Sequence, residues 1–71
     1  MKRIDLIRSL RKEAKVRNLH LVELREGGNH TQFRIGNVTI SVPRHREIRP
    51  ATIRLIERQL QGTFGKGWLI K

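Results

Sequence analysis

Three histidines, His20, His30 and His45, are the side chains of this 71-residue chain that could do acid–base chemistry near neutral pH. The chain has no cysteine, and it lacks the paired carboxylates, the two-histidine zinc motif and the glycine-rich phosphate loop of common enzyme sites. A histidine among arginines can cleave RNA without a metal, because imidazole can deprotonate a ribose 2′-hydroxyl while cations stabilise the charge on the phosphate. These residue types therefore favour RNA chemistry, and they predict no cofactor and no metal site.

His30 is the strongest candidate for the catalytic base. It follows Gly27, Gly28 and Asn29 at the start of a predicted strand, where a glycine backbone can approach a phosphate closely. His45 lies between two arginines before a predicted helix, which is typical of a phosphate contact. His20 lies among leucines and is interpreted as a structural strand residue. The spacing around His30 is equally compatible with an ordinary exposed hairpin residue.

The charge of the chain favours a polyanionic partner. Sixteen basic residues against six acidic ones give a formal net charge of +10, and eleven of the sixteen are arginine. Arginine grips phosphate in two places and stacks on bases, so this ratio favours nucleic acid. A solvated helix face remains the alternative for the arginines between positions 44 and 58. The predicted RNA contacts are Arg25, Gly28, Asn29, Arg34, Arg44, His45, Arg46, Arg49 and Arg54.

The elements that must position these residues follow from hydrophobic periodicity. Apolar residues at helical spacing predict a helix over residues 4–16, and a branched, apolar run predicts a strand over 19–26 that ends at a reversal at Gly27–Gly28. Residues 33–35 and 38–42 alternate with period two around Gly36–Asn37, which predicts a hairpin with a two-residue turn. This register pairs Ile35 with Val38 and makes one face apolar. The opposite, polar face would carry His30, Gln32, Arg34, Thr39 and Ser41.

A second helix is predicted to begin at Pro50, with Ile53, Ile56 and Leu60 facing the core and Gly62 as its end. The tail, residues 62–71, could dock on the core or stay loose. The chain is short enough to form one domain over residues 1–71. Because no apolar stretch is long enough for a signal peptide or a membrane span, we expect a cytoplasmic protein that does not bind membranes.

Two motifs resemble the HicA family of toxins, and the resemblance covers most of the chain to about residue 61. Residues 25–30, Arg-Glu-Gly-Gly-Asn-His, are similar to the family's Gly-Ser-His hairpin. Residues 42–53, Val-Pro-Arg-His-Arg-Glu-Ile-Arg-Pro-Ala-Thr-Ile, are similar to its Pro-x-His segment leading into the last helix. Asn29 replaces the family's usual Ser, and Ala51 replaces a frequent Gly. The tail from Gly62 matches no family pattern.

The resemblance implies an α+β fold in the order α-β-β-β-α, like a double-stranded-RNA-binding domain, with a three-stranded antiparallel sheet and two helices on one face. It also implies the toxin of a toxin–antitoxin system, an endonuclease that cleaves messenger RNA through the histidine matching His30, and a HicB-like antitoxin as partner. A free monomer is the favoured state. The alternatives from the residues alone are a non-catalytic binder of double-stranded RNA and a protein-interaction module with an acidic partner.

Overall fold

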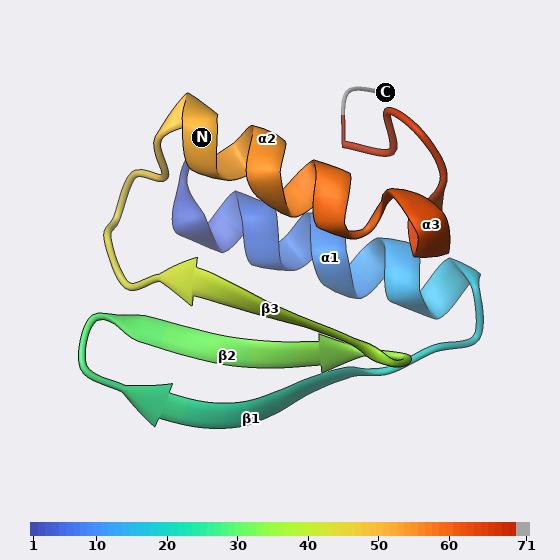
Figure 1. The fold of residues 1–71 in the computed structure, drawn as a ribbon, viewed down its shortest axis with the longest axis horizontal. Helices are drawn as coiled ribbons and strands as arrows, with labels where there is room; N and C mark the ends of the chain where they lie inside the picture. Colours follow the sequence, from blue (N-terminus) through green and yellow to red (C-terminus); the bar gives the residue numbers. More distant parts are fainter. Residues whose placement is uncertain (70–71) are drawn as a thin grey trace.

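The elements of the chain follow the predicted order of helix, three strands and helix, with one short helix added. The computed structural model describes residues 1–69, without the side chains of Arg25 and Glu26. Its elements are α1 (Arg3–Val16), β1 (Leu21–Gly27), β2 (His30–Ile35), β3 (Val38–Pro43), α2 (Pro50–Gln59) and α3 (Gln61–Phe64). Figure 1 shows α1 and α2 on the same side of the sheet. The predicted α+β arrangement with a three-stranded antiparallel sheet is therefore confirmed.

The hairpin between β2 and β3 has the predicted register. Ile35 pairs with Val38, and the ladder continues through four further pairs to His30 opposite Pro43. Gly36 has a φ of +61°, whereas Asn37 does not lie in the positive region. This is the backbone of a two-residue turn that needs glycine at its first central position, and its twist matches that of the paired strands.

The two faces of this hairpin differ in burial as the alternation predicts. Thr31, Phe33 and Ile35 are buried, and Phe33 and Ile35 belong to one core cluster with apolar side chains from both helices, including Leu6, Leu10 and Ile56. Alternate side chains of a strand point to opposite faces. The remaining positions, His30, Gln32, Arg34, Thr39 and Ser41, are all exposed.

The strand β1 differs from its prediction at both ends. It begins at Leu21 instead of residue 19 and continues through Gly27, so that the reversal consists of Gly28 and Asn29. A bulge between Glu23 and Arg25 shifts the register of β1 by one residue. Only Gly28 of the glycine pair has a positive φ, +56°, and Gly27 pairs with His30 as an ordinary strand residue. The turn needs one left-handed residue, and Gly28 supplies it.

The prediction that the last helix ends at Gly62 is wrong. The helix α2 ends at Gln59, and Gly62 lies inside α3, which ends at Phe64 and is followed by Gly65 with a φ of +92°. The helix α3 places Phe64 in the core, where this residue is 2% exposed. Burial of this aromatic ring explains why the chain becomes helical again after Leu60 and includes Gly62, since glycine costs a helix only about 1 kcal/mol.

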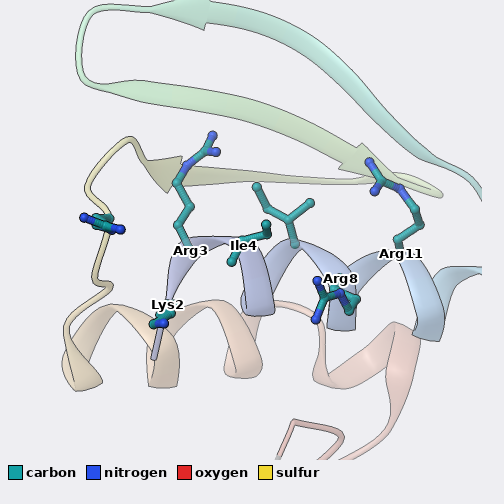
Figure 2. Close-up of a pocket in the computed structure, with 7 residues that line it drawn as sticks. Lys2, Arg3, Ile4, Arg8 and Arg11 are labelled. Atoms are coloured by element: carbon teal, nitrogen blue, oxygen red, sulfur yellow. The ribbon is translucent and has the colours of Figure 1, made fainter.

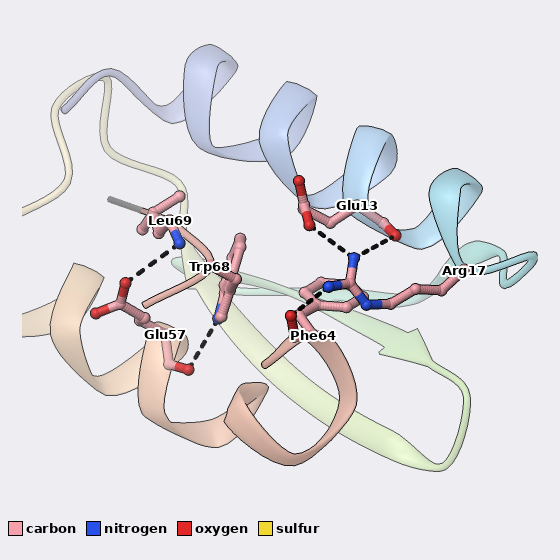
Figure 3. Close-up of polar contacts among 6 residues, drawn as sticks. All are labelled: Glu13, Arg17, Glu57, Phe64, Trp68 and Leu69. Atoms are coloured by element: carbon pink, nitrogen blue, oxygen red, sulfur yellow. Dashed lines mark hydrogen bonds and ion pairs between the residues drawn. The ribbon is translucent and has the colours of Figure 1, made fainter. Parts of the chain in front are cut away.

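The tail docks on the core as far as Leu69, which decides a question that the sequence left open. Trp68 is buried and meets the Phe64 ring edge to face at 5.0 Å. Its indole N–H donates to the Glu57 carbonyl at 2.9 Å, and the Leu69 N–H donates to the Glu57 carboxylate at 3.2 Å (Figure 3). These contacts join the tail to α2.

Arg17 joins the same aromatic pair to α1. Its guanidinium lies 5.1 Å from the centre of the Phe64 ring, donates to the Phe64 carbonyl, and pairs with the buried Glu13 carboxylate at 2.7 Å (Figure 3). A buried carboxylate is costly unless it is paired and hydrogen-bonded, so this ion pair explains how Glu13 is tolerated among apolar side chains. Both helices and the tail are thereby tied into one packed layer.

Candidate functional site

The turn between β1 and β2 is fixed to the loop that follows β3. The backbone N–H of Arg44 donates to the Asn29 carbonyl at 2.7 Å, and its guanidinium donates to the Gly28 carbonyl at 3.4 Å. His30, the first residue of β2, pairs with Pro43, the last residue of β3. These bonds hold residues 44 and 45 beside the turn that precedes His30.

The same loop is fixed on its other side by the start of α1. The Arg3 N–H donates to the Arg46 carbonyl at 2.9 Å, and the Ile48 N–H donates to the Met1 carbonyl at 2.8 Å. The Arg3 side chain donates to the Pro43 carbonyl at 3.1 Å and to the Thr31 hydroxyl at 3.0 Å. Residues 44–49 therefore lie between the hairpin and α1, held by backbone and side-chain bonds.

A hollow of about 350 Å³, the histidine hollow, forms where these segments meet. It is lined by His30, Pro43, His45, Glu47, Ile48, Arg49 and Thr52. His45, Glu47 and Arg49 alternate along the loop and reach the hollow together, while Thr52 comes from the first turn of α2. The structure thus brings His30 beside His45 and Arg49, which follow it by 15 and 19 residues in the sequence.

The electrostatics of the hollow suit an anion. The first turn of α2 contains no acidic residue, and its free N–H groups and positive dipole end lie at the wall that carries Arg49 and Thr52. Glu47 is the only carboxylate among the lining residues that the structure describes, and it lies 3.3 Å from the N-terminal amine of Met1. The charge of that carboxylate is thereby offset by a neighbouring cation.

The other predicted RNA contacts lie outside the hollow. Gly28, Asn29 and Arg44 form its neighbouring turn and rim. Arg34 is on the exposed sheet face four residues from His30, roughly 13 Å along the strand. Arg46 lines a different hollow beside α1. Arg54 is two residues from Thr52 in α2, which places it on nearly the opposite side of that helix.

The side chain of Arg25 lies outside the described residues. Sequence reasoning missed Thr52 and Glu47 as members of the site. Thr52 could have been found from the sequence. Pro50 predicts where the helix begins, and this places the hydroxyl of Thr52 in its first turn. Glu47 carried no local signal, since the bonds of the loop to Met1 and Arg3 decide where it points.

Comparisons with known proteins give no match: no family model, no curated protein and no solved structure matches this chain. The fold and the hollow define a small, strongly basic α+β domain with two imidazoles at one anion-compatible site. No described helix has the length and apolar character needed to cross a bilayer. The described residues contain no cluster of three or more histidine or carboxylate side chains that could hold a metal ion.

The turn beside His30 should depend on Gly28 but not on Gly27. We expect Gly28→Ala to lower the free energy of unfolding by about 1 kcal/mol, because an L residue is strained at φ +56°. Gly27→Ala is the matched control, since Gly27 has no positive φ and an added Cβ would meet nothing within 4 Å. Urea unfolding of the two variants measures the difference, and equal stabilities would contradict the geometry of this turn.

Proposed function

We propose that this chain is a metal-independent RNA endonuclease in which His30 is the general base. The observation that carries the proposal is the histidine hollow, where His30 and His45 share one surface with Arg49 and the start of α2. An exposed imidazole is accessible to an RNA strand, and guanidinium and backbone N–H groups beside it can hold the adjoining phosphate. General base and anion stabilisation are the two requirements of metal-free RNA cleavage.

The reaction proceeds by attack of the RNA on its own backbone. A ring nitrogen of His30 accepts the proton of the ribose 2′-hydroxyl, and the 2′ oxygen forms a bond to the adjacent phosphorus. The bond from phosphorus to the 5′ oxygen breaks, leaving a 2′,3′-cyclic phosphate on one product and a 5′-hydroxyl on the other. The imidazolium of His45 donates the proton that the departing 5′ oxygen needs, and Arg49 balances the charge that builds up on the phosphate.

The resemblance to HicA toxins supports the same activity. The two motifs that carry it are residues 25–30, which contain His30, and residues 42–53, which contain His45 and Arg49, and the three side chains line the same hollow. The order α-β-β-β-α supports a fold like that of a double-stranded-RNA-binding domain. On this basis we propose a cytoplasmic toxin that acts on messenger RNA and is neutralised by a HicB-like antitoxin. Asn29 keeps a hydrogen-bonding side chain where the family has serine.

The test is incubation of the purified protein with RNA in the presence of a metal chelator. We expect fragments that end in 2′,3′-cyclic phosphate, identified by mass spectrometry, and no cleavage of the same sequence as DNA or as 2′-O-methyl RNA, which lack the attacking hydroxyl. Tight RNA binding without fragments would replace this proposal with a non-catalytic RNA binder. Absence of RNA binding at low salt would leave a protein-interaction module.

A further inference from the structure

A second and larger hollow, of about 650 Å³, runs beside α1 (Figure 2). We call it the α1 groove. Five cations line it, together with two isoleucines: Lys2, Arg3, Arg8 and Arg11 from the helix and the residue before it, and Arg46 from the loop after β3. None of its described lining residues is acidic. A lining of this kind attracts a polyanion.

Little of this positive charge is neutralised within the protein. Among the side chains that the structure describes, Lys2, Arg11 and Arg46 form no ion pair. Arg8 pairs with Asp5 at 3.5 Å, but their side chains are 73% and 49% exposed, and such pairs are weak. Arg3 alone is committed to the fold, through its bonds to Pro43 and Thr31.

The α1 groove and the histidine hollow share one wall. Along the loop after β3, His45, Glu47 and Arg49 line the histidine hollow, and Arg46, between them, lines the groove. The loop is therefore a ridge with a cationic groove on one side and the two imidazoles on the other. A phosphate chain bound at the histidines reaches the α1 groove by crossing Arg46.

The length and lining of the groove fit a nucleic acid strand better than an acidic protein. From Lys2 to Arg11 is nine residues, or about 13 Å along the helix axis at 1.5 Å per residue. This distance is long enough to hold more than one phosphate of an RNA strand, each beside a cation of the groove. Ile4 is 63% exposed, but single exposed apolar side chains are common on protein surfaces and do not form a docking patch.

We propose that the α1 groove binds RNA phosphates on one side of the cleavage site. These phosphates belong to the same strand that enters the histidine hollow. This inference rests on the proposed function and extends it to the substrate class. The substrate is then an RNA strand that continues for several nucleotides beyond the scissile phosphate, and a dinucleotide or a very short oligonucleotide is held by the histidine hollow alone.

The test compares two non-cleavable RNAs, a 5-mer and a 15-mer of mixed sequence with 2′-O-methyl riboses, by fluorescence anisotropy at several salt concentrations. The variant is Arg8→Ala/Arg11→Ala, and Arg58→Ala/Lys66→Ala is the control, because it removes two exposed cations that line neither hollow. Alanine favours helix, so α1 should persist in the variant, and circular dichroism verifies it.

For the 15-mer, we expect the slope of log affinity against log salt to fall in magnitude by about 1.4 in the Arg8/Arg11 variant, at about 0.7 per lost phosphate contact. The 5-mer slope should fall by less, because a strand of this length cannot fill both hollows at once. An unchanged 15-mer slope, or an equal change in the control, would overturn the inference.

Cleavage of a 2′-hydroxyl RNA by the wild type is measured separately, so the proposed function can hold even if the α1 groove does not bind RNA. The groove can also be probed by NMR titration. If poly-L-glutamate shifts the signals of the residues that line the α1 groove and RNA does not, the inference that the groove binds RNA is wrong.

Discussion

His30→Ala should lower the rate of RNA cleavage by about 10² to 10⁴-fold, because this is the usual contribution of a positioned general base. His30 is exposed at the start of β2 and carries no side-chain bond in the described structure, so the variant should fold normally. Its affinity for 2′-O-methyl RNA should be nearly unchanged, since the cations that hold the phosphates remain. A cleavage time course with a fluorescent RNA, read beside a thermal unfolding curve, separates loss of chemistry from loss of fold.

His20→Ala is the matched control for this experiment. His20 is also exposed, but it precedes β1 and lines a different surface hollow with Arg11 and Lys15. We expect this variant to cleave RNA at the wild-type rate. If His30→Ala cleaves as fast as His20→Ala, the imidazole of His30 is not the base, and the role assigned to the histidine hollow fails even if the protein still degrades RNA.

Trp68→Ala should lower the free energy of unfolding by about 3 to 5 kcal/mol, the usual cost of deleting a buried aromatic side chain. Trp68 is 3% exposed, packs on Phe64 and donates to the Glu57 carbonyl, so the variant loses an apolar contact and a hydrogen bond together. Small domains have total stabilities of only about 5 to 15 kcal/mol, and the variant will be close to unfolding at 37 °C. Urea titration followed by circular dichroism measures the effect.

Trp68→Phe keeps the experiment informative when the alanine variant does not fold. It retains an aromatic ring beside Phe64 and removes the indole N–H that donates to Glu57, and we expect a cost nearer 1 kcal/mol. Lys66→Ala, in the same tail but exposed, should be close to neutral. A loss of less than about 1 kcal/mol for Trp68→Ala would mean that the tail does not dock in solution.

Local patterns in the sequence were sufficient for the hairpin that carries His30. Alternation with period two assigned Phe33 and Ile35 to the core and His30 to the open face, and Gly36 fixed the turn and therefore the register. A shift of the register by one residue would turn the apolar side chains of a strand to solvent. The pattern is therefore compatible with only one pairing of the two strands. The start of α2 at Pro50 was likewise predictable, because proline at the first helical position needs no partner in the helix.

The ends of elements were less predictable, because they depend on contacts from elsewhere in the chain. The strand β1 contains a bulge, and Gly27 pairs with His30, so the turn is formed by Gly28 and Asn29 and not by Gly27 and Gly28. Gly62 is a good helix end by local chemistry, yet the chain remains helical there because Phe64 is buried against Trp68 and Arg17. Burial of two aromatic rings outweighs the local preference of one glycine.

The sequence by itself determined the cationic character of this protein, the polar strand face with His30 and the separate position of His45 before a helix. Only the tertiary structure decided that the two histidines meet, that Arg46 turns to the α1 groove and that Arg54 faces away. The physical reason is that the loop over residues 44–49 has no regular structure of its own. Hydrogen bonds to Asn29, Met1 and Arg3, distant in sequence, fix its path and so choose the side chains that share a surface.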